Sequence, residues 1–361
     1  MRFDQIIVLI MTAFLVLGGI DRMFGSRLKL GTAFENGIRT MGELAFSMLG
    51  IMVLAPVIAD ILTPVVSPVF RLMGADPAMF AGSVLACDMG GAQLARELAA
   101  SEEAAQLGGI ITASTLGGTV SFTIPFSMNA LRQEDRTYGA KGILCGVITV
   151  PVGIFVGGVA AGFPVGMVAV NCVPVLVMSL LIALGLWKAE RVLVKAFAIF
   201  GKCITAISVV GIVAAGVQSM MGWTIIPNLG DVEGSLVIVG QIALVLAGAF
   251  PLIQVLTWAL KKPFAWFGKR LGINDTAVSG LVASLANAIA AFTMVKDMNP
   301  RGKVVNMAFA VSGAFVFGDH LAFTAGFDAE MIPPLIVGKL VGGVTAVALA
   351  MLVTKKENAA E

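Results

Sequence analysis

One stretch of this chain places an acidic side chain beside two glycines inside an otherwise apolar run. Asp88 lies in GSVLACDMGG, residues 82–91, and is followed directly by Met89, Gly90 and Gly91. A carboxylate that faced lipid would cost roughly 2.5–3.5 kcal/mol, and backbone loosened by glycine is tolerated in a membrane only where it lines a cavity or packs on protein. The stretch therefore predicts one half of a binding site for a small cation. The alternative is that Asp88 caps a helix or neutralises a buried lysine.

A second acid, Asp319, lies beside the only histidine of the chain, His320, in an apolar run that we expect to form one helix over residues 304–326. At 3.6 residues per turn, its face is shared by Ser312, Phe315 and Phe323. A carboxylate flanked by phenyl rings suits an alkylammonium ion, because ion pairing and cation–π attraction combine. His320 lies about 100° around the helix, where it could accept a substrate hydroxyl, orient Asp319, carry a coupling proton or simply pack.

Two further polar features are candidates for the same site. Thr115 and Thr119 belong to a stripe of four threonines in the apolar run 106–127, and Asn287 interrupts the apolar segment 276–296. Small polar residues often hold membrane helices together, so both packing and a polar lining stay open for the threonines. We expect Asn287 at the tip of a folded-back segment.

The elements that must position these residues are membrane helices. Of the 361 residues 58% are hydrophobic and 13% are charged, whereas a soluble domain carries about 25% charged residues. Two segments, 77–100 and 276–296, are apolar but interrupted by polar residues and glycines. Nine uninterrupted runs are long enough to cross about 30 Å of hydrocarbon: 5–20, 43–63, 106–127, 142–162, 167–187, 197–221, 236–260, 304–326 and 331–353.

The distribution of Lys and Arg decides how the two interrupted segments run. The basic loops are expected at 21–40, 132–141, 188–202, 261–270 and 296–303. All of them lie on the cytoplasmic side, as the positive-inside rule requires, only if both interrupted segments enter and return. The sequence thus predicts an all-α polytopic membrane protein with about nine transmembrane helices, two re-entrant helical hairpins, the N-terminus outside and the C-terminus in the cytoplasm. A hairpin arm of about 11–12 residues reaches ~17 Å at 1.5 Å per residue, close to the bilayer midplane.

The order helix, helix, hairpin, helix, helix occurs twice. A displacement of 198 positions aligns Gly50 with Gly248 and Gly74 with Gly272. An odd number of crossings separates the copies, so the arrangement is an inverted repeat, which is typical of transporters. The predicted parts are a first repeat over 1–162 with hairpin 77–100, a connector helix and cytoplasmic loop over 163–196, a second repeat over 197–353 with hairpin 276–296, and a cytoplasmic tail over 354–361.

The remaining residues give little support to other classes of protein. HExxH, GxSxG and Walker motifs are absent, and the four cysteines show no CxxC spacing, so we expect no catalytic residue, metal or cofactor. Nothing resembles a basic nucleic-acid surface. Glu43 and Asp60 are expected at the membrane boundaries, and the role of Lys339 stays open between snorkelling and offsetting Asp319. The GxxxG motifs at 153–157 and 338–342 predict helix packing, with a homo-oligomer interface as the alternative.

Several longer strings resemble one family. GADPAMFAGSVLACDMGG (74–91), AFAVS (308–312), FGDHLAF (317–323) and PPLIVGKLVGGVTA (333–346) are similar to those of the bacterial ethanolamine permeases, and the similarity extends over roughly 1–353. The resemblance implies a permease of the inner membrane. It would import ethanolamine for cleavage elsewhere in the cell, in functional association with the enzymes of the ethanolamine-utilisation microcompartment.

Residues and resemblance together predict a transporter or facilitator in which intramembrane carboxylates bind protonated ethanolamine near the bilayer midplane. Two alternatives stay open. One is an ion-coupled transporter of another small polar solute, such as a nucleoside or an amino acid. The other is an intramembrane enzyme acting on lipid headgroups, which the absence of a nucleophile–base or metal motif disfavours.

Overall fold

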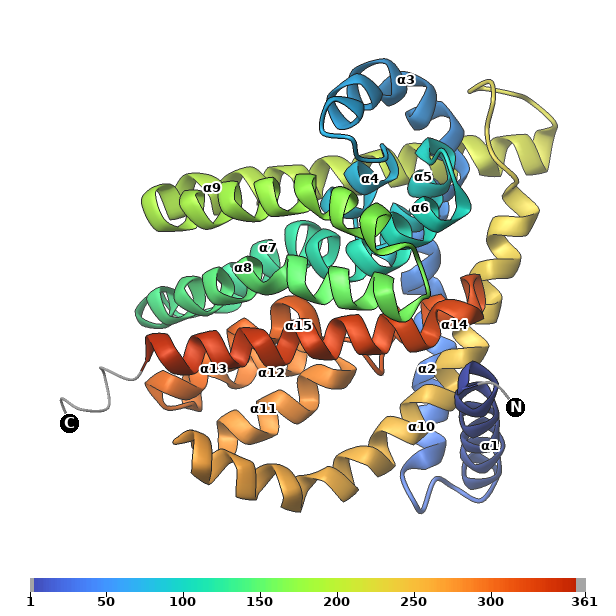
Figure 1. Cartoon of the computed structure of the whole chain (residues 1–361). Coiled ribbons are helices and arrows are strands. Elements are labelled where there is room, and N and C mark those ends of the chain that lie inside the picture. The colour runs from blue at the N-terminus through green and yellow to red at the C-terminus, as the bar shows by residue number, and fades with distance from the viewer. Residues whose placement is uncertain (1–2, 355–361) are drawn as a thin grey trace.

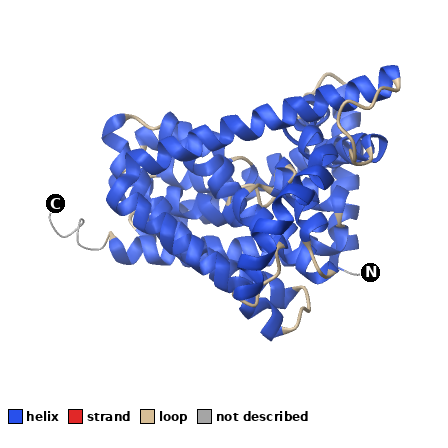
Figure 2. Cartoon of the chain, turned by 90° about the horizontal axis from the view of Figure 1, so that it is seen from above, coloured by secondary structure: helices blue, strands red, loops and turns tan. Residues whose placement is uncertain are grey.

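The computed structural model describes residues 3–354, and within this range the chain is helical without strands (Figures 1 and 2). The predicted all-α class is therefore confirmed. Apart from Thr354, the predicted tail at 354–361 lies outside the described residues. The α-helices are α1 (Phe3–Met23), α2 (Leu30–Leu44), α3 (Gly50–Leu72), α4 (Ala78–Val84), α5 (Gly91–Leu98), α6 (Glu102–Gln106), α7 (Ile124–Ala130), α8 (Arg136–Ala160), α9 (Val165–Met221), α10 (Val232–Leu271), α11 (Asp275–Ala286), α12 (Ala288–Met294), α13 (Pro300–Gly313), α14 (Asp319–Phe327) and α15 (Ile332–Val353).

Shorter helical turns join or continue these helices. Three are π-helical: η1 (Ala45–Leu49), η3 (Leu107–Gly117) and η4 (Thr119–Thr123). Four are 3₁₀ turns: η2 (Cys87–Met89), η5 (Gln133–Asp135), η6 (Val295–Asp297) and η7 (Ala329–Met331). Because η1 links α2 to α3 without a break, residues 30–72 form one continuous helical stretch.

Seven helical stretches among residues 3–354 are long and apolar enough to span a membrane, which makes this a multi-pass membrane protein. They are Asp4–Met23, Leu30–Leu72, Glu102–Ala130, Gln133–Ala160, Val165–Met221, Val232–Ala259 and Ala329–Val353. The 57 residues of α9 would extend roughly 85 Å at 1.5 Å per residue, far more than one crossing needs. A kink with non-helical dihedral angles at Ala189 (φ −143°, ψ 41°) divides α9 into two parts.

All five predicted basic loops are largely helical. α2 begins at Leu30, inside the loop predicted at 21–40; α9 continues through 188–202; and the backbone of α10 continues through 261–270. These loop predictions were wrong because Lys and Arg are good helix formers whose long side chains can reach water from a helix. Clustered positive charge therefore marks a membrane boundary but does not require the helix to end there.

The single helix predicted over 304–326 is also wrong. α13 ends at Gly313 and α14 begins at Asp319, and residues 314–318 between them are not helical. With 14 and nine residues, neither helix alone reaches the roughly 20 residues that a bilayer crossing requires.

Both interrupted segments fold back on themselves, so that their two ends lie close together. In the first, which contains α4 and α5, the Asp76 carboxylate accepts hydrogen bonds from the backbone N–H of Ala78 (2.8 Å) and of Ala100 (3.0 Å), so the two ends meet. In the second, which contains α11 and α12, the Asn274 side chain donates to the Asp297 carbonyl at 2.9 Å. Each pair of short helices is thus closed at its base, and its tip lies at the break between the helices: residues 85–90 in the first and Asn287 in the second.

Small residues bring α8 and α15 close together, and the two helices lie side by side in Figure 1. A Cβ on Gly153 would lie 2.6 Å from the carbonyl oxygen of Gly338, and a Cβ on Gly338 would lie 2.9 Å from that of Gly153. Gly157 and Gly342 extend the same contact. The two GxxxG motifs therefore pack against each other within one chain, as the packing interpretation predicts.

Candidate functional site

A cavity of about 290 Å³ lies where the tips of both folded-back segments meet the break between α13 and α14. Its polar and charged lining comes from both halves of the chain. The lining residues are Thr40, Glu43, Leu44, Ser47, Ala86, Asp88, Met89, Ser114, Gly118, Phe122, Thr123, Asn287, Ile289, Ala310, Val311, Ala314, Phe315, Asp319, His320 and Lys339.

Asp88 reaches this cavity from the tip of the first folded-back segment. α4 ends at Val84, the backbone is extended at Leu85 and Ala86, and Asp88 sits in a single 3₁₀ turn. Gly90 then takes a left-handed conformation (φ +86°) and starts α5, a conformation that strains residues with a Cβ. The tip thus exposes one carboxylate, whose side chain is 17% accessible.

Asp319 reaches the cavity because the second half unwinds in front of it. Phe315 adopts φ +61°, which is uncommon for a residue other than glycine. The backbone N–H groups of Phe315 and Phe317 donate to the carbonyls of Ser284 and Leu285, both at 2.9 Å. These carbonyls belong to the last turn of α11, so the unwound segment and the end of α11 satisfy one another.

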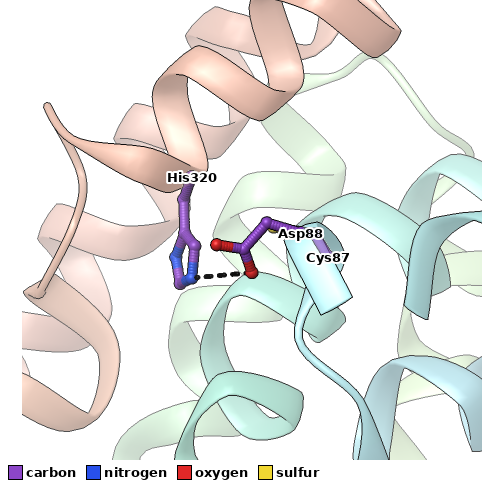
Figure 3. A group of neighbouring side chains, drawn as sticks. All are labelled: Cys87, Asp88 and His320. Carbon is purple, nitrogen blue, oxygen red and sulfur yellow. Dashed lines mark ion pairs between the residues drawn. The ribbon is translucent and has the colours of Figure 1, made fainter. Parts of the chain in front are cut away.

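Asp319 and His320 form the first turn of α14. A carboxylate is favourable at this end because of the partial positive charge of a helix N-terminus. The imidazole is 7% exposed, with its Nε2 3.8 Å from an Asp88 oxygen (Figure 3). Its ring lies 5.3 Å from that of Phe315, and its Nδ1 has no hydrogen-bond partner within the described residues.

Lys339 lies on α15 and is 1% exposed. Its Nζ donates a hydrogen bond of 2.5 Å to the carbonyl of Ser114 in the π-helical stretch η3. It is close enough to Asp88 for the two charges to interact. The role that the sequence left open thus resolves in one respect: this lysine does not snorkel to water but ends in the cavity.

Cys87, Asp88 and His320 place a thiol, a carboxylate and an imidazole within 4.8 Å of one another (Figure 3). Thiolate, carboxylate and imidazole groups are common ligands of transition metals such as zinc. The ammonium group of Lys339, which interacts with both Cys87 and Asp88, repels a divalent cation at this place. Because this repulsion grows with the charge of the ion, a singly charged organic cation suits the place better than a divalent metal ion.

Comparison with known proteins identifies the family. The family described as "Ethanolamine utilisation protein, EutH" matches residues 3–353. The chain belongs to the EutH family. It is 48% identical to a probable ethanolamine permease EutH of Listeria monocytogenes serotype 1/2a (strain 10403S), with 99% of this chain and 95% of the relative covered.

Two further relatives show the same extent of similarity. A probable ethanolamine permease EutH of Salmonella typhimurium (strain LT2) is 41% identical, covering 100% of this chain and 98% of the relative. The uncharacterized protein YxeR of Bacillus subtilis (strain 168) is 44% identical, covering 99% and 97%. No solved structure matches the chain. The permease names of the EutH relatives agree with the expectation of a transporter rather than an enzyme.

The cavity of this EutH chain brings together half of the residues predicted for the site. Those that line it are Asp88, Met89, Asn287, Phe315, Asp319 and His320. Those outside its lining are Gly90, Gly91, Thr115, Thr119, Ser312 and Phe323. The two acids come from distant parts of the sequence, and their meeting at one cavity is the central agreement between the sequence and the structure.

The residues outside the lining have packing partners instead. Gly90 packs on Ile51, and Gly91 lies beside the Leu85 carbonyl. The hydroxyls of Thr115 and Thr119 donate to the carbonyls of Ile111 (2.9 Å) and Val311 (3.0 Å). These contacts favour the packing interpretation of the threonine stripe.

The prediction that Ser312, Phe315 and Phe323 share a helix face with Asp319 was wrong, because it assumed a continuous helix. Ser312 lies in α13, before the break, and packs against Gly342. Phe323 lies in α14, after the break, where its ring stacks on Phe327 with centroids 5.0 Å apart. Phe315, inside the break, alone of the three lines the cavity.

Sequence reasoning missed several polar residues of the lining: Thr40, Glu43, Ser47 and Ser114. Thr123, the last threonine of the stripe in 106–127, does line the cavity. Glu43 was expected at a membrane boundary; it is exposed and lies at the rim of the cavity. The signal available for Lys339 was its position inside the apolar string PPLIVGKLVGG, since intramembrane charges are usually functional. No comparable signal marked Thr40 or Ser47.

Proposed function

We propose that this EutH chain is an ethanolamine permease that binds the protonated amine in the cavity between Asp88 and Asp319. Ethanolamine resembles the side-chain amine of lysine, so it is almost wholly protonated at neutral pH, and its charge makes unaided passage through hydrocarbon costly. The relatives from Listeria monocytogenes and Salmonella typhimurium are named probable ethanolamine permeases. The observation that carries the proposal is that the two intramembrane acids line one cavity inside an apolar helical body.

The other groups of the cavity match the rest of the substrate. The ring of Phe315 offers a face to the alkylammonium group, and His320 is a partner for the hydroxyl. The Nδ1 atom of His320, unpaired in the described structure, is free to donate or accept. Asn287 completes the lining from the second folded-back segment. Met89 and Phe122 supply the apolar contacts for two methylene groups.

The topology that we propose has nine crossings. The seven apolar stretches become eight when α9 is divided at Ala189, and α13 with α14 form a broken ninth. The segments 77–100 and 276–296 would then be re-entrant hairpins, because their helices are too short to span and their ends meet. The N-terminus would lie outside and the C-terminus in the cytoplasm, in the bacterial cytoplasmic (inner) membrane.

An inverted repeat is supported by matched packing as well as by the order of elements. A Cβ on Gly50 of α3 would collide with the backbone of Ser208 in the second part of α9. Gly248 of α10 is the residue that corresponds to Gly50 after the displacement of 198 positions. A Cβ on Gly248 would collide with the backbone of Met11 in α1. Equivalent glycines thus pack on near-equivalent positions of the opposite repeat. The proposed parts are the repeats 1–162 and 197–353, joined by the connector 163–196.

The ethanolamine that enters would pass to the enzymes of the ethanolamine-utilisation system, so this chain's role would be supply of substrate. The direct test is uptake of radiolabelled ethanolamine by proteoliposomes containing the purified protein. We expect uptake by the wild type and its loss in Asp88→Asn and Asp319→Asn. Each substitution replaces a carboxylate of the cavity by a neutral amide and so removes one negative charge from the place that would bind the ammonium ion.

A matched control is Asp60→Asn, because Asp60 is exposed on α3, accepts a hydrogen bond from Asn228 (2.9 Å) and lies outside the cavity. This variant is expected to transport like the wild type. Size-exclusion chromatography in detergent reports whether each variant is folded. Equal flux with and without the wild-type protein would refute the transport function, and normal uptake in both cavity variants would refute the assigned site.

A further inference from the structure

Lys339 carries a charge that the proposed binding of ethanolamine does not use. Its side chain is 1% exposed, and a buried ammonium group is costly unless it is paired and hydrogen-bonded. One hydrogen bond goes to the carbonyl of Ser114. The remaining stabilisation must come from a negative charge, and the acidic partner with which it interacts is Asp88.

The two acids of the cavity are not equivalent. Asp88 lies in the field of the Lys339 ammonium, with which it lines the same cavity, and its oxygen is 3.8 Å from the Nε2 of His320, too far for a hydrogen bond. Among the side chains that the structure describes, the carboxylate of Asp319 has no hydrogen-bond or ion-pair partner, and the charges acting on it are those of Asp88 and Glu43, both acids. Asp319 nevertheless lines the cavity.

We propose that Lys339 is a fixed counter-ion of Asp88, and that by leaving Asp319 as the one uncompensated carboxylate it makes the cavity selective for ions with a single positive charge. This inference rests on the proposed function. Counted with both carboxylates and the ammonium ionised and the imidazole neutral, the cavity carries one net negative charge. One ethanolammonium ion neutralises it, whereas a diammonium ion would bring an excess positive charge into a poorly solvated space.

Glu43 does not alter this count in the interior, because its side chain is exposed at the rim and its charge is screened by water. Removal of the Lys339 charge should leave two uncompensated acids facing each other. That arrangement favours a dication, whereas a single monocation would leave one of the two negative charges uncompensated. Lys339 is thus a specificity-determining residue rather than a direct ligand of ethanolamine.

The test compares the affinities of the purified protein in detergent for ethanolamine and for 1,3-diaminopropane, a doubly protonated amine of similar width, by isothermal titration calorimetry. The wild type is expected to prefer ethanolamine. In Lys339→Gln the ratio of the two affinities should shift toward the diamine by about tenfold or more, the scale of one charge-assisted contact. Lys339→Arg, which keeps the charge, should retain the preference for ethanolamine.

A double variant separates this role from a role in folding. Asp88→Asn alone leaves the Lys339 ammonium without its acid, so it should bind neither amine. Asp88→Asn combined with Lys339→Gln restores one net negative charge at Asp319 and should recover binding of ethanolamine over the diamine.

The outcomes distinguish the two proposals. A wild type that does not bind ethanolamine would overturn the proposed function itself. A wild type that binds it, together with an unchanged affinity ratio in Lys339→Gln, would overturn only the role of Lys339. Failure of the double variant to bind any amine would also overturn that role, since it would show that Lys339 is required for structure and not for charge.

Discussion

Replacement of Gly90 by alanine tests how firmly the tip that carries Asp88 is held. Gly90 has φ +86°. A Cβ built on Gly90 would collide with the side chain of Ile51 on α3, whose Cγ2 and Cβ atoms would lie 2.3 Å and 2.6 Å away. The left-handed conformation costs roughly 1–2 kcal/mol for a residue with a Cβ, and overpacking a tight contact costs about 1–3 kcal/mol. The variant Gly90→Ala should therefore lose roughly 2–5 kcal/mol of stability.

Gly162→Ala is the matched control. Gly162 has nearly the same backbone conformation (φ +81°), but nothing lies within 4 Å of a Cβ built there. Its substitution should cost only the conformational part, about 1–2 kcal/mol. The difference between the two variants then measures the packing of the tip on α3.

Unfolding by increasing SDS in mixed micelles supplies the free energies, and a double-mutant cycle with Ile51→Ala isolates the contact. Ile51→Ala removes the Cγ2 methyl group, which would lie 2.3 Å from the new Cβ, but keeps the Ile51 Cβ at 2.6 Å. The combined loss should therefore fall short of the sum of the single losses by only part of the overpacking cost, about 1 kcal/mol. Equal destabilisation by Gly90→Ala and Gly162→Ala, together with additivity in the cycle, would refute the packing of this tip on α3. Ethanolamine uptake should fall in Gly90→Ala beyond any loss of folded protein, because Asp88 lies in the turn that the strain displaces.

Two structural predictions follow from side chains outside the cavity. Asp76→Ala should destabilise the protein by about 2 kcal/mol, because the backbone N–H groups of Ala78 and Ala100 lose a charged acceptor; Asp76→Asn, which can still cap one of them, should lose less in the same SDS titration. Asp135 is 1% exposed and forms an ion pair with Lys303. Lys303→Met would leave Asp135 as a buried charge without a partner and should cost about 3–5 kcal/mol of stability. Adding Asp135→Asn should recover part of that loss. No recovery in the double variant would show that the pair contributes packing rather than charge.

The parts of the site that could be predicted from sequence are those in which a residue type conflicts with its surroundings. Asp88 and Asp319 each stand in an apolar run, and that conflict alone predicted that both avoid lipid and share a cavity. The interrupted segments 77–100 and 276–296 were evident for the same reason. Positive charges were less informative, since helices such as α9 and α10 continue through the stretches that contain them.

The break before Asp319 could not be predicted, because its cause lies elsewhere in the chain. Residues 314–318 are as apolar as the helices on either side, and hydropathy does not reveal which backbone groups will find partners. The N–H groups of Phe315 and Phe317 are satisfied by α11, a helix that is distant in sequence. Ser312 and Phe323 were assigned to the same helix face as Asp319 on the assumption of an unbroken helix, and that assignment was wrong because the helix is broken between them.

The same break explains how Asp319 comes to face the cavity. A continuous helix through residue 319 would satisfy its own backbone and would present one more side chain to its neighbours. Unwinding frees backbone groups that lipid could not satisfy, so the segment is stable only where another folded-back element, here the end of α11, supplies carbonyls. Asp319 is thereby fixed at the start of α14 and lines the same cavity as Asp88, which the other interrupted segment supplies. Asp88 and the Ser114 carbonyl come from the first half, whereas Asp319 and Lys339 come from the second. The proposed cation site therefore requires both halves to fold together.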